Sequence, residues 1–150
     1  MTLRNILVTS LLLVTPAVPV AQSVTVSEGQ QATVYKLPTC ACCEGYIAFL
    51  RQQGVRVEVV TDDAALALVK AEQRVPYDVQ SCHTVLLGGY VLEGHVPLVA
   101  LEKLLAEQPE VTGIAVPGMP TGTPGIEGPR IGNLDVITFG EGGVGAFLSL

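Results

Sequence analysis

Three of the four cysteines stand within four residues, in the segment Cys40-Ala41-Cys42-Cys43, and the fourth is Cys82. The segment contains a C-x-x-C, a C-x-C and a vicinal pair. Thiolates act as nucleophiles, as redox groups and as ligands for soft metal ions. Because three sulfurs so close in the chain can act on the same partner, the spacing predicts a reactive or metal-binding cluster.

Four cysteines in a small exported domain are also compatible with two structural disulfides. The spacing argues against that alternative, because a disulfide within the triplet closes a very short loop and adds little stability. Adjacent residues such as Cys42 and Cys43 also strain the geometry of a disulfide. A chain of 150 residues can bury a core without such crosslinks. We therefore favour the reactive cluster.

Two histidines and one methionine add further soft donors. His83 directly follows Cys82, His95 lies in a Glu-Gly-His-Val-Pro segment, and Met119 lies in a Pro/Gly loop. A histidine is more often a hydrogen-bonded core or surface residue than a ligand, and Met119 could simply fill a gap in the loop. His83 and Cys82 can share one ion only if the chain bends locally, since neighbouring side chains of a strand point to opposite faces. The candidate metal ligands are therefore Cys40, Cys42, Cys43, Cys82, His83, His95 and Met119.

The donor types indicate which metal the cluster would take. Thiolate, thioether and imidazole groups select Cu(I) first and zinc next, and thiolates argue against calcium and magnesium. Zinc would accept four cysteines or three with one histidine. The second half of the usual zinc knuckle is incomplete, because it holds Cys82 alone. Crowded thiolates suit Cu(I), which tolerates low coordination and bridging sulfur, so a multinuclear copper site is compatible with the spacing.

Hydrophobic periodicity predicts an alternating α/β core over residues 32–109. The expected elements are strand 33–37, a helix from about Cys40, strand 55–61, helix 64–73, strands 84–87 and 90–93, and a helix after Pro97. The first two strands should pair in parallel across a right-handed crossover. The order β-α-β-α-β-β-α is the thioredoxin-like one. In it the loop holding Cys82 lies beside the start of the first helix, so all four sulfurs should meet.

The predicted helix that begins at the cluster has one apolar face, made of Cys43, Tyr46, Ile47 and Leu50. Thr39 is the expected N-cap residue. Free backbone N–H groups and the helix dipole stabilise anions at such a position, which favours thiolates. The first turn of this helix is therefore where reactive sulfur chemistry is expected.

The two ends of the chain are predicted to differ from this core. Residues 1–23 resemble a secretory signal peptide, with Arg4 before an uncharged apolar run that is shorter than the ~20 residues of a membrane span. The mature part, residues 24–150, is therefore expected to be a single exported domain in an oxidising compartment, without a membrane anchor. Residues 111–150, rich in glycine and proline, are predicted as loops with a terminal strand that decorate the core.

Composition excludes several classes of function. The net charge is −6, which argues against a nucleic-acid partner because such proteins need cations to displace phosphate counterions. Hydrophobic residues make up 49% and charged residues 15%, so the chain is not disordered. Aromatic residues make up 5% and tryptophan is absent, which argues against stacking platforms for sugars or bases.

The ordered motifs resemble those of the CopG-type periplasmic copper-resistance proteins, a family long described as a domain of unknown function. The matching segments are Tyr35–Cys43, Val75-Pro76 before Ser81-Cys82-His83-Thr84, Glu93–Pro97, Gly113–Pro120 and Gly122–Glu127. The resemblance implies a thioredoxin-like fold, a copper-binding cysteine cluster, and copper handling in the periplasm together with other periplasmic copper-handling proteins. The chain departs from the family pattern at Ala41 and Tyr46, and at Ile126, where the family often has methionine.

Three hypotheses about function follow. The first is copper binding coupled to thiol redox chemistry, which would interconvert Cu(I) and Cu(II); whether the protein turns over or stores copper stays open. The second is a thiol–disulfide oxidoreductase built on Cys40 and Cys43, although Cys42 would interfere with a simple dithiol. The third is a structural zinc-binding domain, in which removal of one cysteine should unfold the protein.

Overall fold

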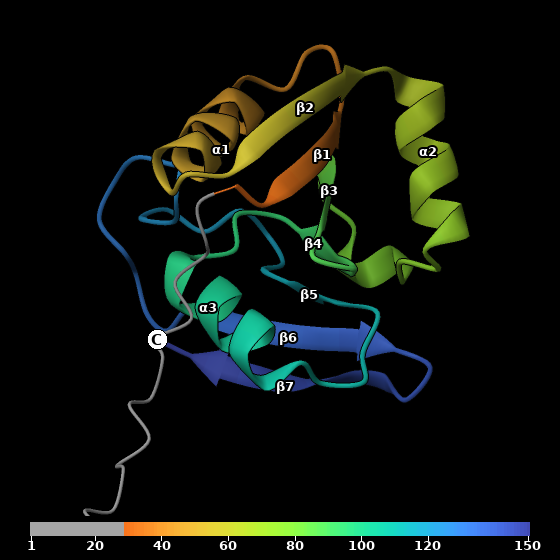
Figure 1. Ribbon diagram of the computed structural model, residues 1–150. Coiled ribbons are helices and arrows are strands. Elements are labelled where there is room, and N and C mark those ends of the chain that lie inside the picture. Colours follow the sequence, from red (N-terminus) through yellow and green to blue (C-terminus); the bar gives the residue numbers. More distant parts are fainter. Residues whose placement is uncertain (1–28) are drawn as a thin grey trace, which may run out of the picture.

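A seven-stranded mixed sheet runs through the computed structural model, which describes residues 29–150 (Figure 1). The predicted signal peptide lies outside the described residues. The elements in chain order are β1 (Gln31–Lys36), α1 (Ala41–Gln52), β2 (Arg56–Thr61), α2 (Asp63–Glu72), the short 3₁₀ helix η1 (Tyr77–Val79), β3 (His83–Leu87), β4 (Tyr90–Glu93), α3 (Leu98–Glu107), β5 (Gly113–Ala115), β6 (Asp135–Gly140) and β7 (Gly143–Ser149). The predicted succession of strands and helices up to α3 is confirmed.

The strands lie in the order β2-β1-β3-β4-β5-β6-β7. β1 is parallel to β2 and β4 is parallel to β5, while the other neighbours are antiparallel. The predicted parallel pair and the hairpin are both present. Gly88 and Gly89 have φ of +59° and +85°, as a two-residue hairpin turn requires.

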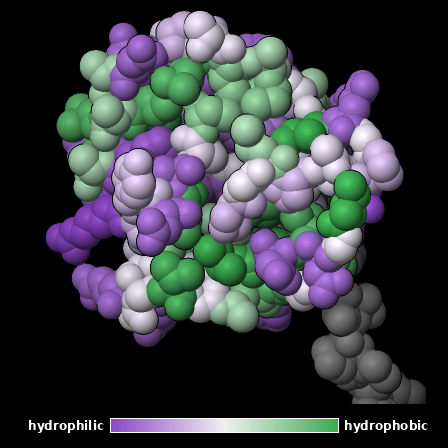
Figure 2. Space-filling view, turned by 180° about the vertical axis from the view of Figure 1, so that it is seen from behind, coloured by the Kyte–Doolittle hydropathy of each residue, from purple (hydrophilic) through white to green (hydrophobic). Residues whose placement is uncertain are grey.

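Helices cover both faces of the sheet. The larger core lies under α1 and α3, where Ile47, Leu50 and Leu101 pack on strand residues such as Val85. α2 lies away from these two helices (Figure 1) and reaches Thr84 on the opposite face through Lys70. The surface is not uniformly polar, since Figure 2 shows hydrophobic groups among hydrophilic ones on the face seen from behind.

The N-termini of α1 and α2 are capped differently. The Asp62 side chain accepts a hydrogen bond from the backbone N–H of Ala65 at 2.7 Å, which caps α2 as expected. The prediction that Thr39 caps α1 is wrong, because the N-cap residue is Cys40, which makes no side-chain cap bond. The first turn of α1 therefore begins without a hydroxyl cap. Within residues 29–150, no helix is long and apolar enough to cross a membrane.

The C-terminal region is more ordered than its composition indicates. The glycine and proline content predicts loops with one strand for residues 111–150, but this region contributes three strands to the main sheet. Ile114 and Phe139 are fully buried there. Gly113 leaves space for the carbonyl of Val91 and the ring of Phe139, which a Cβ would contact. This region is therefore part of the core, and Gly113 permits a close approach of strands.

Candidate metal centre

The four cysteine sulfurs meet where β1 ends and β3 begins. β1 leads directly into α1, and β3 runs antiparallel to β1 with His83 opposite Lys36. The backbone N–H of Leu37 donates to the carbonyl of Cys82 at 3.2 Å, which places Cys82 beside the first turn of α1. The Sγ atoms of the four cysteines all lie within 4.8 Å of one another. The predicted convergence is confirmed.

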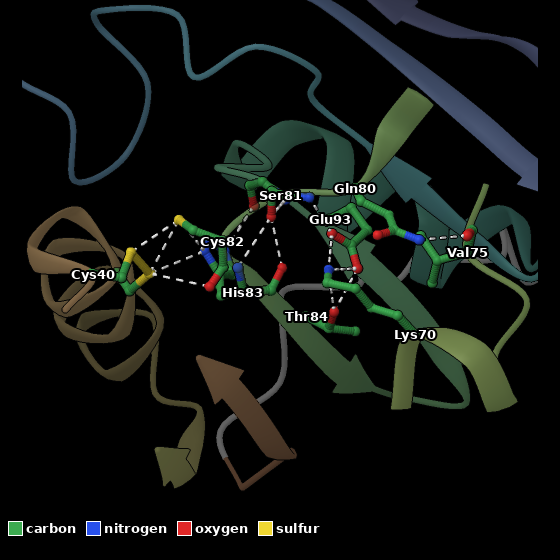
Figure 3. A network of polar contacts seen from close by, with 11 residues as sticks. Cys40, Lys70, Val75, Gln80, Ser81, Cys82, His83, Thr84 and Glu93 are labelled. Atoms are coloured by element: carbon green, nitrogen blue, oxygen red, sulfur yellow. Dashed lines mark hydrogen bonds and ion pairs between the residues drawn. A yellow bond between two sulfur atoms is a disulfide. The ribbon is translucent and has the colours of Figure 1, made fainter. Parts of the chain in front are cut away.

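The cluster is partly oxidised. Cys40 and Cys43 form a disulfide, and Cys42 and Cys82 are free thiols. Cys82 Sγ lies 2.9 Å from Cys40 Sγ, 3.4 Å from Cys43 Sγ and 3.9 Å from Cys42 Sγ (Figure 3 shows the group around Cys40 and Cys82). A framework of two structural disulfides is therefore not what these four cysteines form.

The Cys82 thiol is difficult to ionise in this state. Burial, and then the neighbouring Cys42, raise its pKa to about 11, whereas the Lys70 ammonium acts in the opposite direction. A thiol with that pKa is protonated at neutral pH. A metal ion must therefore displace its proton to bind, as thiolate ligation generally requires.

His83 faces the sulfurs with a free lone pair. The chain bends at Cys82, which provides the local turn that shared ligation requires. His83 Nδ1 lies 3.5 Å from Cys43 Sγ and 3.9 Å from Cys82 Sγ, and Nε2 lies 3.1 Å from the carbonyl of Gly94. Burial, and then His95, lower the pKa of His83 to about 3, so the ring is neutral. Nε2–H must then donate to the carbonyl, which leaves Nδ1 as an acceptor toward the cysteines.

His95 is buried next to His83 but makes different contacts. Its ring centroid lies 5.1 Å from that of His83 and 5.3 Å from that of Tyr46. Nδ1 donates to the carbonyl of Pro124 at 2.7 Å, and the buried Nε2 has no hydrogen-bond partner among the described residues. Burial lowers the pKa of His95. The neutral ring therefore carries an unused lone pair in the interior, which is costly unless something binds it.

The loop after β5 carries Met119 to the cluster. Met119 Sδ lies 4.0 Å from Cys42 Sγ, and the side chain is 49% exposed. The loop is held against α1 at Gly45, where a Cβ would lie only 2.8 Å from the Cα of Gly125. The contact between Pro124 and His95 anchors the same loop from the other side. Met119 is therefore at the solvent side of the cysteines, where a soft donor can meet an incoming ion.

A buried charge pair that the sequence patterns did not reveal lies on the side of Cys82 that is away from Cys40 (Figure 3). Lys70 Nζ lies 2.8 Å from both carboxylate oxygens of Glu93 and 2.8 Å from Thr84 Oγ1. Glu93 also accepts the backbone N–H of Ser81 at 2.8 Å. Lys70 follows Leu66 by four residues and so lies on the apolar face of its helix. A charged residue at that position is the sequence signal that could have indicated a buried ion pair.

Ser81 extends this network to both sides of Cys82. Its hydroxyl accepts the backbone N–H of Gly94 at 2.9 Å and donates to the carbonyl of His83 at 2.6 Å. The residues before and after Cys82 are thus tied to the end of β4. These hydrogen bonds hold the backbone on both sides of Cys82, so a movement of its sulfur requires rotation of the side chain.

Comparisons with known proteins find one matching family model and similar solved chains. Residues 79–126 match the family model described as "Protein of unknown function, DUF411". Two solved chains named "Copper resistance protein copG" are each 34% identical to this chain. Form 2 aligns over 81% of this chain and 98% of its own, with a TM-score of 0.71, and Form 1 over 80% and 96%, with 0.72. A comparison with curated proteins finds no match.

Replacement of Lys70 by Met should destabilise the protein by roughly 3–5 kcal/mol, because it leaves the Glu93 carboxylate buried without its cation. Urea unfolding measures this cost. The matched control is Glu107→Gln, which breaks the exposed Lys103–Glu107 pair and should cost less than about 1 kcal/mol. Equal small losses in both variants would contradict the importance of the buried pair.

Proposed function

Because the chain belongs to the CopG-type copper-resistance family, we propose that it binds Cu(I) through Cys40, Cys42, Cys43 and Cys82. The observation that carries this proposal is the convergence of four Sγ atoms within 4.8 Å. Sulfur donors at this density favour Cu(I), and zinc is the next alternative. The reduced form is the binding form, since the disulfide occupies two of the four sulfurs.

Three other donors would complete or shield the site. His83 offers Nδ1 at 3.5 Å from Cys43, and Met119 offers a thioether at 4.0 Å from Cys42. His95 offers the buried Nε2 that lacks a partner among the described residues. Bridging thiolates would allow the cluster to hold more than one copper ion. These roles are part of the proposal.

We further propose that copper binding is coupled to thiol oxidation. Formation of one disulfide from two thiols releases two electrons and two protons, and two Cu(II) ions can accept those electrons to become Cu(I). The Cys40–Cys43 disulfide beside two free thiols is an arrangement such a reaction would leave. In the opposite direction, reduction of the disulfide restores the two missing ligands.

The proposed setting is the periplasm, reached through the signal peptide predicted at residues 1–23. The related structures are named for copper resistance, which supports a role outside the cytoplasm. The sheet order β2-β1-β3-β4, with β1 parallel to β2, supports a thioredoxin-like core. Partners would be copper ions and other periplasmic copper-handling proteins.

An anaerobic Cu(I) competition titration of the reduced protein tests this proposal, with zinc titrated in parallel. Cys42→Ser should weaken Cu(I) binding by at least ~10–100-fold, the loss typical of even supporting groups at metal sites. The control variant Val144→Ala, exposed on β7, should leave binding unchanged. Cu(I) affinity no greater than that of a simple dithiol, or a preference for zinc, would contradict the proposal.

A second candidate function is thiol–disulfide exchange with other proteins, and the Cys40–Cys43 disulfide at the start of α1 favours it. Metal-free insulin reduction separates the two functions. If copper binding is the function, the wild-type protein should reduce insulin no faster than a small-molecule dithiol at the same concentration. Fast turnover that Cys40→Ser abolishes and Val144→Ala retains would instead establish the oxidoreductase.

A further inference from the structure

Cys40 lies at the centre of the sulfur cluster. It is bonded to Cys43, and its Sγ lies 2.9 Å from Cys82 Sγ and 3.4 Å from Cys42 Sγ. Both of these neighbours are free thiols. We propose that the disulfide migrates within the cluster, between a Cys40–Cys43 pairing and a Cys40–Cys82 pairing.

The exchange needs no external oxidant or reductant. Cys82 loses its proton to solvent, and its thiolate attacks Cys40 Sγ. The bond between Cys82 and Cys40 forms as the bond between Cys40 and Cys43 breaks, and the electron pair leaves on Cys43. Cys43 then takes a proton, so the number of disulfides and of free thiols stays the same.

The position of Cys82 Sγ relative to the Cys40–Cys43 bond determines which atoms must move during the exchange. Cys82 Sγ is 2.9 Å and 3.4 Å from the two bonded sulfurs, so it lies beside their bond and not on its extension. Attack therefore requires a side-chain rotation that brings Cys82 Sγ onto the axis of the bond. To form the new disulfide, the 2.9 Å separation must shorten to about 2.05 Å. The hydrogen bonds of Ser81 fix the backbone on both sides of Cys82, so the side chain provides this movement.

The two pairings leave different thiols free. With Cys40–Cys43 bonded, the free thiols are Cys42 and Cys82, and the thioether of Met119 lies 4.0 Å from Cys42. With Cys40–Cys82 bonded, the free thiols would be Cys42 and Cys43, and Cys43 lies 3.5 Å from the imidazole of His83. Cys42 stays free beside Met119 in both pairings, whereas the free thiol nearest the imidazole changes from Cys82, at 3.9 Å from His83 Nδ1, to Cys43, at 3.5 Å. The bearing of this change on metal binding rests on the proposed copper function, whereas the exchange itself does not.

Peptide mapping distinguishes the two pairings, because trypsin separates Cys82 from the peptide that holds the other three cysteines. Cleavage after Lys36 and Arg51 releases residues 37–51, and cleavage after Arg74 and Lys103 releases residues 75–103. The metal-free mature protein with one disulfide is incubated anaerobically at pH 8 with a chelator, quenched in acid and treated with N-ethylmaleimide before digestion. The expected product is the two peptides joined by a disulfide, with two blocked thiols, at a level that rises during incubation.

Two variants make the result decisive. In Cys42→Ser, Cys82 is the only free thiol that can attack, and joined peptides with one blocked thiol are still expected. Cys82→Ser must give no joined peptides, which verifies the mapping. The proposal is overturned if Cys42→Ser, shown to be folded by circular dichroism, yields only separate peptides. It is also overturned if every joined product of the wild type lacks a blocked thiol, because such a product carries a second disulfide formed by oxidation. No copper enters the assay, so its outcome is independent of the copper titration.

Discussion

The pairing of β1 with β3 determines where the reactive groups of this protein lie. Its register sets Lys36 opposite His83, and one residue further the N–H of Leu37 meets the carbonyl of Cys82. β1 continues into α1, so the cysteines of its first turn must meet the cysteine that precedes β3. A shift of one residue would turn the side chains of β3 to the other face and separate these groups. The cluster is thus a consequence of strand register.

Burial determines the chemical state of the donors that register brings together. His83 and His95 are both neutral, and each donates one N–H to a backbone carbonyl, which leaves the other nitrogen without a proton. The thiol of Cys82 keeps its proton at neutral pH because its pKa is about 11. Soft metal ions can bind neutral imidazole and displace thiol protons, whereas hard cations prefer oxygen. Behind the donors, the Lys70–Glu93 pair holds Ser81 and so fixes the backbone that carries Cys82.

Local sequence signals predicted most of the site, and long-range contacts account for what they missed. Periodicity and turn residues indicated the elements through α3, and the order of these elements brought Cys82 to Cys40. Of the strands after residue 111, only a terminal one was predicted. β5 and β6 were missed because they are stabilised by pairing with β4, with each other and with β7, which glycine-rich segments do not reveal. The partner of Lys70 could not be identified, because an ion pair across 23 residues depends on how α2 packs on the sheet.

Coordination of copper by sulfur is the central claim, and X-ray absorption at the copper edge tests it most directly. The reduced mature protein would be loaded with Cu(I) under anaerobic conditions, and its spectrum compared with that of Cys82→Ser. The structure predicts a first coordination shell dominated by sulfur, which loses sulfur and gains lighter neighbours in the variant. A first shell of nitrogen and oxygen alone in the wild type would contradict the assignment of the cysteine cluster as the copper site.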